Sequence, residues 1–191
     1  MESLAVHFNG PLTFATGPRS LFTSEFARAA CIYLWTIQSE IDDKYWIHYV
    51  GETGDLRMRQ KEHLIHMLGL NYGIFDVVEA RRGVARLVWR GVWREGLPNG
   101  PSHSLDEYRT LAPAVRDYVD ALAVFVAPLN VGRPQREHIE GSIANSLRTK
   151  HPECSTLYPR DCRTGCGAEA GVRLEITSDE PIAGLDSPLD I

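Results

Sequence analysis

Three stretches of this chain have the hydrophobic pattern of β-strands. Residues 30–37 and 45–50 are rich in aromatic and β-branched residues, and the polar segment QSEIDDK separates them. Two such stretches with a polar connection predict an antiparallel hairpin. The compact apolar stretch at residues 121–129 predicts a third, buried strand.

Helical spacing begins after a turn at residues 51–55, whose polar side chains suit the N-terminal cap of a helix over 55–70. At 100° per residue, Arg59, His63 and His66 fall together on one side of this helix. The apolar residues spread over the opposite face: Leu56, Met58, Leu64, Ile65, Met67 and Leu68.

The remaining pattern predicts three further elements. Residues 84–94 alternate with period two and predict a strand with a basic face, and 96–104 predict a loop rich in Gly, Pro, Ser and Asn. A helical pattern over 105–118 contains Pro113, which should kink or divide it. Another helix is expected over 133–148, with a proline in its first turn.

The two hairpin strands carry the tripeptides Cys31-Ile32-Tyr33 and Tyr49-Val50-Gly51. Residues 49–63 read YVGETGDLRMRQKEH, which matches Y-[IV]-G-x-T-x-x-L-x-x-R-x-x-x-H. With these features the chain resembles the GIY-YIG nuclease family, although a cysteine and a valine replace one glycine and one isoleucine. The resemblance implies a small α/β (α+β) domain over 30–150, with a central antiparallel or mixed three-stranded sheet flanked by helices.

The resemblance also implies roles for five side chains. One of Tyr33 and Tyr49 would act as general base while the other positions water or phosphate, and either assignment is open. Arg59 would hold a phosphate oxygen as negative charge builds, since its guanidinium is planar and always charged. His63 would take or relay a proton. Glu140 would bind one Mg²⁺ or Mn²⁺ ion, because a carboxylate is a hard oxygen ligand.

Glu140 lies at the edge of the apolar stripe of the predicted last helix. That stripe has i, i+4, i+8 spacing: Ile139, Ile143 and Leu147. Glu137 competes for the metal role from one turn away. In a purely structural interpretation, Arg136 and Glu140 form a surface ion pair worth about 0.3–0.5 kcal/mol.

The net charge of −5 lies entirely in residues 167–191, so the rest of the chain is neutral overall. We expect this acidic tail to be a solvated extension; the alternative is that it occupies a basic groove. Within the neutral part, arginines between positions 81 and 94 have no carboxylate among them. Arg86, Arg90 and Arg94 are therefore predicted to bind DNA phosphates, although a solvated strand face explains them equally well.

His151, Cys154, Cys162 and Cys166 have zinc-binding side chains with the loose spacing H-x2-C-x7-C-x3-C. A structural Zn²⁺ ion needs four such ligands in a tetrahedron. Reduced and unrelated thiols explain the same cysteines more simply, and four cysteines in a chain of this length do not indicate a disulfide framework.

The expected organisation has an N-terminal extension at 1–29 and the nuclease-like domain at 30–150, with an insertion at about 71–120. A cysteine-containing loop and the acidic tail follow at 151–191. The composition, 43% hydrophobic, is enough for a core. We found neither a membrane-spanning stretch nor a signal-peptide pattern, which favours a cytoplasmic protein.

The predicted function is that of a metal-dependent endonuclease that hydrolyses phosphodiester bonds in DNA. Because the chain has little positive charge, the insertion, a homodimer or a protein partner would supply further DNA contacts. The alternative is a non-cleaving nucleic-acid-binding module of the same fold, stabilised by zinc.

Overall fold

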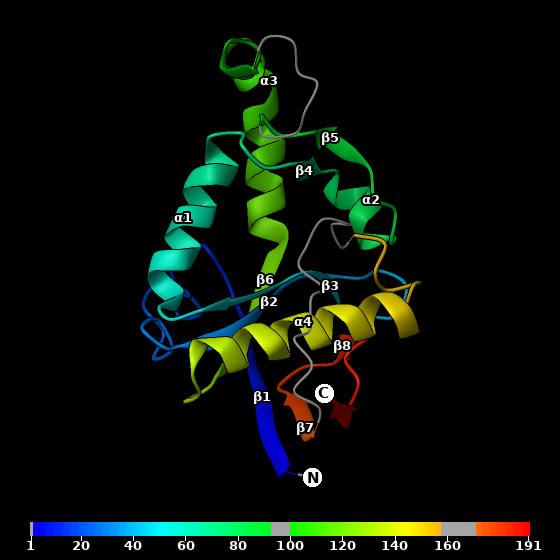
Figure 1. The fold of residues 1–191 in the computed structure, drawn as a ribbon. Helices are drawn as coiled ribbons and strands as arrows, with labels where there is room; N and C mark the ends of the chain where they lie inside the picture. The colour runs from blue at the N-terminus through cyan, green and yellow to red at the C-terminus, as the bar shows by residue number, and fades with distance from the viewer. Residues whose placement is uncertain (1, 93–99, 158–170) are drawn as a thin grey trace.

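The computed structural model describes residues 2–92, 100–157 and 171–191. In these ranges, one mixed sheet of seven strands has the order β8-β3-β2-β6-β1-β7-β9 (Figure 1). Its strands are β1 (Glu2–Leu12), β2 (Cys31–Gln38), β3 (Tyr45–Thr53), β6 (Leu122–Pro128), β7 (Val172–Ser178), β8 (Ile182–Ala183) and β9 (Leu189–Asp190). A separate pair joins β4 (Ile74–Phe75) to β5 (Leu87–Trp89). The helices are α1 (Leu56–Leu68), α2 (Val77–Arg81), α3 (Gly100–Ala121) and α4 (Arg133–Lys150).

The predicted hairpin and the third strand are confirmed, and they form the centre of the sheet as β3-β2-β6, all antiparallel. The α+β class is compatible with this architecture, but the expected three-stranded sheet is wrong. β1 adds to β6, and β7 then pairs with β1 in parallel. The central strands β2 and β6 are buried on both faces. Strands from both ends of the chain extend the sheet around them.

The expectation of a solvated acidic tail is also wrong. In β7, Leu174 and Ile176 are buried, whereas Arg173 and Glu175, which alternate with them, are exposed. The charges thus occupy one side of an amphipathic strand, and the apolar residues join the core through the other side. The described part of the tail thus forms β7 and β9 at one edge of the sheet and β8 at the other.

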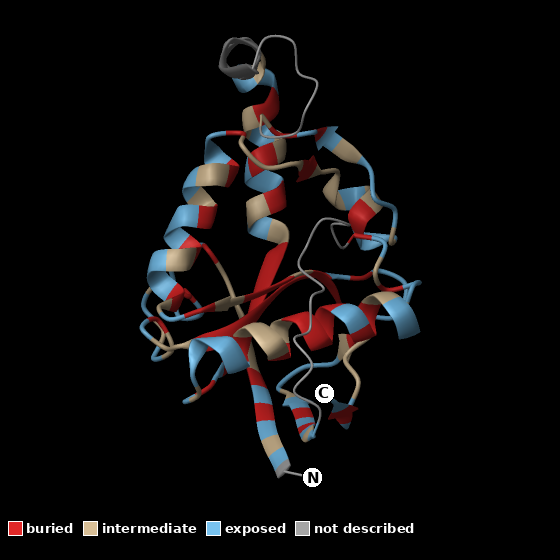
Figure 2. Cartoon of the chain, viewed as in Figure 1, coloured by how far each residue is buried: buried red, intermediate tan, exposed pale blue. Residues whose placement is uncertain are grey.

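Successive side chains along β2 and β6 point to opposite faces of the sheet, so the two faces carry different residues. Ile32, Leu34 and Phe125 pack with α4 on one face. Tyr33 and Trp35 pack with α1 and α3 on the other. Figure 1 shows α1, α2 and α3 on one side of the sheet and α4 on the other, and Figure 2 shows the central strands buried between these layers.

Helix α1 begins where the sequence predicts, since the Asp55 side chain accepts a hydrogen bond from the Met58 backbone N–H at 2.9 Å. Its buried face combines residues from both groups of the helical wheel. Leu56 and Met67 of the apolar group are buried together with Gln60 and His63, whereas Met58 is 53% exposed and Ile65 is 55% exposed. His63 therefore faces the core.

Two boundaries in the insertion also differ from the prediction. Helix α3 begins at Gly100 and continues through Pro113, so residues 100–104 are helical rather than a loop. In residues 84–92, the described part of the predicted strand over 84–94, only β5 is a strand. At Gly91, just after it, φ is +88° and a Cβ would lie 2.6 Å from the Asn71 carbonyl oxygen. In the described part of the chain, no helix is long and apolar enough to cross a membrane.

Candidate active site

Tyr33 of β2 lies at the centre of the candidate site with its side chain fully buried. Its hydroxyl is 2.8 Å from Nε2 of His63 and also hydrogen bonds with the Arg59 side chain. Gly51 is the partner of Tyr33 on β3, and a Cβ there would come within 2.4 Å of the Tyr33 hydroxyl. The glycine of the second tripeptide is thus needed for the tyrosine of the first to fit.

The hydrogen bonds at Tyr33 form a chain whose direction follows from its donors. Because arginine only donates, the Tyr33 oxygen accepts from Arg59 and the Tyr33 proton goes to Nε2 of His63. The ring proton of His63 then lies on Nδ1, 3.0 Å from the Tyr72 hydroxyl. Tyr72, between α1 and β4, is absent from the family pattern and was missed by the sequence analysis.

Burial sets the protonation states of Tyr33 and His63. Burial, and then the charge of Arg59, lower the pKa of His63 to about 3, so its imidazole is neutral at pH 7. Burial, and then the neighbouring Tyr49, raise the pKa of Tyr33 well above its ordinary value, although Arg59 opposes this rise. Tyr33 is therefore a protonated donor in the resting protein.

Tyr49 reaches the site with the help of a β-bulge. The pairing of β3 with β2 shifts by one residue at His48. Such a bulge re-aims side chains, so that the consecutive residues His48 and Tyr49 both line one cavity instead of pointing to opposite faces. The Tyr49 ring lies 6.0 Å from the Tyr33 ring, and, unlike Tyr33, Tyr49 is only partly buried.

A second polar pair explains the inward face of α1. Trp35 donates its indole N–H to Oε1 of Gln60 at 2.9 Å, and both side chains are buried. The Nε2 of Gln60 has no hydrogen-bond partner among the described residues. Because Tyr33 and Trp35 bring polar groups into the core, α1 turns Gln60 and His63 toward them, alongside the apolar Leu56 and Met67.

Glu140 of α4 is partly buried and lies close enough to affect Tyr33. Burial is the main cause of the raised Tyr33 pKa, and the negative charge of Glu140 contributes to it. Glu137, the competing carboxylate, instead forms an ion pair with Arg133 at 3.0 Å. Of the two, Glu140 is thus the one with an electrostatic link to the tyrosine cluster.

Arg136 attaches α4 to the hairpin, one turn before Glu140. Its buried guanidinium is 3.1 Å from Oε2 of Glu52 on β3, and its Nη1 donates to the Val131 carbonyl at 2.7 Å. The sequence analysis did not anticipate this pair between Arg136 and Glu52. Removing one partner of such a buried pair leaves an uncompensated charge, so the contact fixes the position of α4.

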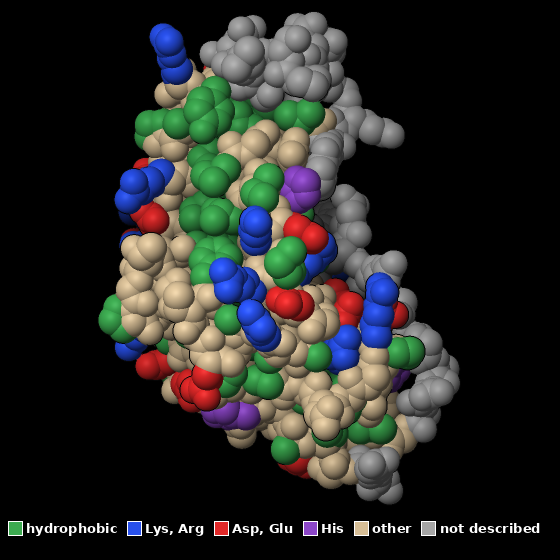
Figure 3. All heavy atoms as spheres, turned by 90° about the vertical axis from the view of Figure 1, so that its left-hand side faces the viewer, with side chains coloured by type: hydrophobic (Ala, Val, Ile, Leu, Met, Phe, Trp, Pro, Cys, Tyr) green, Lys and Arg blue, Asp and Glu red, His purple; other side chains and the backbone are tan. Residues whose placement is uncertain are grey.

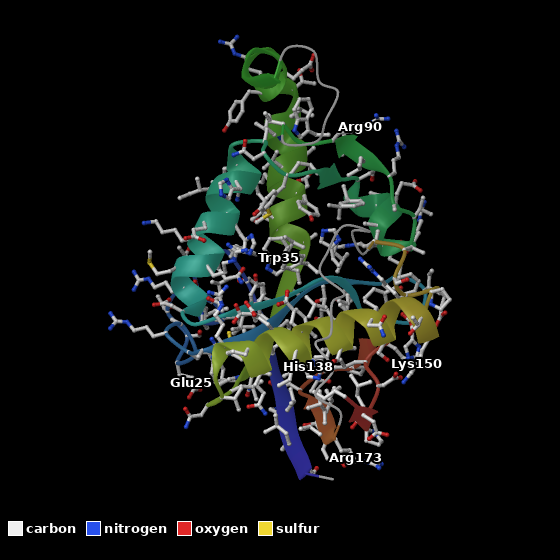
Figure 4. All side chains as sticks on the ribbon, viewed as in Figure 1. Glu25, Trp35, Arg90, His138, Lys150 and Arg173 are labelled. Carbon is white, nitrogen blue, oxygen red and sulfur yellow. The ribbon has the colours of Figure 1, made fainter. Side chains whose placement is uncertain are left out.

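A cavity of about 350 Å³ opens beside the cluster, between the sheet, α1, α3 and the β4–β5 pair. Tyr49, Arg59 and His63 line it, whereas Tyr33 is sealed beneath them. Figure 4 shows Trp35 in the space between the sheet and the helices above it, and Arg90 beside β5; both residues line the cavity. Three of the predicted site residues therefore share one hollow with residues of the insertion.

The insertion closes one wall of the cavity through a buried His–Tyr pair. Nδ1 of His48 donates to the Leu157 carbonyl at 3.0 Å, and Nε2 accepts from the Tyr118 hydroxyl of α3. Burial lowers the pKa of His48 to about 4. Sequence reasoning missed this pair, because neither residue belongs to the motif and they are 70 positions apart.

The predicted arginine strip is divided in the structure. Arg86 precedes β5 and lies 3.8 Å from Asp76, Arg90 lines the cavity, and Arg94 lies outside the described residues. On the α1 side of the molecule, which is the side away from β5, Figure 3 shows lysine and arginine side chains scattered among hydrophobic ones. The binding of Arg86, Arg90 and Arg94 to DNA stays a prediction.

Half of the predicted zinc set falls outside the described residues, namely Cys162 and Cys166. In the described half, Nε2 of His151 is 2.6 Å from Asp186, and Nδ1 faces Glu153 at 3.7 Å. Cys154 is buried as a free thiol. The His151 ring is thus engaged by carboxylates, and the zinc site stays a prediction.

Comparison with family models, curated proteins and solved structures finds no match to this chain. The candidate site therefore rests on the motif and on its geometry.

Proposed function

We propose that this chain is a metal-dependent endonuclease of the GIY-YIG type that hydrolyses phosphodiester bonds in DNA. The observation that carries the proposal is the packing of the motif residues into one cluster. The Tyr33 hydroxyl is hydrogen bonded to both Arg59 and His63, Gly51 makes room for the Tyr33 ring, and the cluster borders a cavity. A merely structural tyrosine does not need this arginine and histidine together.

Glu140 suits a Mg²⁺ or Mn²⁺ ion. Among the described residues, no group of three or more His, Cys, Asp or Glu side chains could hold a metal. That rules out an all-protein cage in this part of the chain, but Mg²⁺ is usually held by one or two carboxylates and keeps several waters. Glu140 and the phosphate would hold the ion, which would stabilise negative charge on the leaving oxygen.

Burial suggests a division of work between the two tyrosines. We assign Tyr49 to the attacking water, because it lines the cavity while the Tyr33 hydroxyl is sealed from solvent. Arg59 would hold a non-bridging phosphate oxygen as charge develops. Tyr33 and neutral His63 would orient Arg59 and connect the site to Tyr72 for proton movement.

Nicking of supercoiled plasmid at low salt, with Mg²⁺ or Mn²⁺, tests the proposal. We expect Arg59→Ala to lower the rate about 10²- to 10³-fold, as when one transition-state donor is removed, and Glu140→Gln to abolish metal-dependent nicking. Arg57→Ala and Glu137→Gln are matched controls, one on each helix, and should cut like wild type. Equal loss in Glu137→Gln and Glu140→Gln would contradict the assignment of the metal ligand.

A wild-type protein that binds DNA and never cuts it would overturn the nuclease and support the non-cleaving module. Tightly held zinc would also favour that module.

A further inference from the structure

The cavity beside the cluster is larger than hydrolysis alone requires. Its volume of about 350 Å³ is at the lower end of the roughly 300–1,000 Å³ typical of small-molecule sites. A scissile phosphate needs only Arg59 and Tyr49 of the lining, and Glu140, the proposed metal ligand, is not among the described residues that line the cavity. The remaining space lies between α1, α3 and β5, and the insertion supplies much of its wall.

The walls of the cavity are mainly aromatic. Trp35 and Tyr49 come from the hairpin, Tyr72 and Phe75 from the segment after α1, and Tyr118 from α3. Flat aromatic side chains are the surfaces on which proteins stack unpaired bases, and each stacked base strengthens binding whatever its identity.

The charged groups of the cavity are of one sign. Arg59 and Arg90 line it, and no Asp or Glu is among the described lining residues. The two histidines of the lining, His48 and His63, are buried and engaged in neutral hydrogen bonds. The cavity thus combines a flat apolar interior with two guanidinium groups, which bind phosphate strongly.

We propose that this cavity binds one unpaired nucleotide of the DNA substrate, with its base between the aromatic walls and its phosphates at Arg59 and Arg90. This inference rests on the proposed function and specifies its substrate as DNA with an unpaired nucleotide beside the cut. A base that is stacked and paired inside a duplex cannot enter a cavity between α1, α3 and the sheet, so it would first have to leave the helix, at a cost of unstacking and unpairing.

Other occupants fit the cavity less well. Arg59 already pairs with Glu62, whose Oε2 lies 3.2 Å from Nη1, so a phosphate at Arg59 would compete with that carboxylate. A purely apolar ligand would leave the guanidinium group of Arg90 unused, and a bare phosphate would leave the aromatic walls unfilled. A nucleotide satisfies both parts at once. The free nucleotide and the unpaired nucleotide of a strand share this chemistry, and the position of the catalytic motif at the rim favours the strand.

Binding without metal separates this inference from the proposed function. In EDTA, fluorescence anisotropy compares a duplex that carries one bulged adenine with the same duplex fully paired. We expect the bulged duplex to bind about tenfold tighter or more. Leu87→Trp should remove this preference by filling the cavity, whereas Val88→Trp should retain it, because the neighbouring Val88 side chain is exposed outside the cavity.

Arg90→Ala gives a second variant that does not disturb the core, since the Arg90 side chain is exposed. It should reduce the preference for the bulged duplex, whereas Arg86→Ala should weaken both duplexes equally and leave the ratio unchanged. Deoxyadenosine 5′-monophosphate is the probe for the free nucleotide. If it binds as tightly as the bulged duplex, the occupant is a free nucleotide, and the substrate assignment is wrong.

The outcomes distinguish the two proposals. If wild type cuts DNA but Leu87→Trp and Arg90→Ala keep the full preference for the bulge, the cavity inference fails and the nuclease stands. If the preference exists in EDTA, depends on the cavity, and no DNA is cut with Mg²⁺ or Mn²⁺, the nuclease fails and the nucleotide site stands. Equal binding of both duplexes by wild type overturns the cavity inference directly.

Discussion

The two faces of the central sheet differ in what they bury. Against α4, β2 presents Ile32 and Leu34, which pack in an aliphatic core. Against α1 and α3, the intervening residues Tyr33 and Trp35 carry polar groups, and each finds a partner inside the core. One strand of eight residues thus contributes to two environments with different chemistry.

The α4 face therefore contributes mainly to stability, and the α1 and α3 face holds the polar groups that chemistry needs. Apolar burial on the α4 face is non-directional and depends on filled volume. On the other face, the pairs Tyr33–His63, Trp35–Gln60 and His48–Tyr118 depend on geometry, because a buried polar group without its partner is costly. Substitutions on the two faces should therefore separate loss of stability from loss of function.

Leu34→Ala should have the largest effect on stability. Leu34 is fully buried on the α4 face, so its truncation should lower the free energy of unfolding by about 2–5 kcal/mol. Urea denaturation measures the loss, and the folded fraction should retain its cleavage rate. Leu34→Ile, which conserves volume, should cost less than about 1.5 kcal/mol. A large change in cleavage rate without loss of stability would show that the two faces are not separate.

Tyr33→Phe, one residue earlier, should affect the cleavage rate more than the stability. The ring and its packing remain, but Nε2 of His63 and the Arg59 side chain lose the hydroxyl. We expect the free energy of unfolding to fall by about 1–3 kcal/mol and the nicking rate to fall about 10²-fold. Tyr45→Phe, outside the cluster on β3, is the control and should change either quantity little. A Tyr33→Phe protein that nicks plasmid like wild type would exclude Tyr33 from the site.

Local patterns predicted the local elements well. The hairpin, β6, α1 and α4 follow from periodicity and capping, and the motif places Tyr33 beside Arg59 and His63. The pairing of β1 with β7 was not predictable in this way, because it joins residues 2–8 to 172–178 without any local signature. Charge alone suggested a solvated tail, whereas the alternation around Leu174 and Ile176 was the better signal.

The buried face of α1 and the cavity depend on contacts that no single helix or strand reveals. A helical wheel weighs Gln60 and His63 as polar, but Trp35 and Tyr33 make them interior residues. The bulge at His48 likewise changes the side to which one strand residue points. Such features arise from pairs of side chains far apart in the chain, so they become visible only when the tertiary structure is known.

The pH dependence of stability offers the finest test of the comparison, because the histidines engaged in the polar pairs lie on the α1 and α3 face. The unfolded chain takes up a proton at each histidine near pH 6.5, whereas burial keeps the pKa of His63 at about 3 and that of His48 at about 4 in the folded state. Between these values the unfolded state binds more protons, so the free energy of unfolding falls as pH falls. Each histidine contributes up to about 1.4 kcal/mol per pH unit.

His63→Gln removes one titrating group but keeps a side chain that both donates and accepts hydrogen bonds. Urea denaturation between pH 6 and about 4.5 should therefore show a slope that is shallower than that of wild type by about 1 kcal/mol per pH unit. Leu34→Ala should shift the whole curve downward without changing its slope, since no titrating group is involved. If His63→Gln retains the wild-type slope, His63 is not held neutral by burial, and the hydrogen-bond direction from Tyr33 through His63 to Tyr72 must be reversed or abandoned.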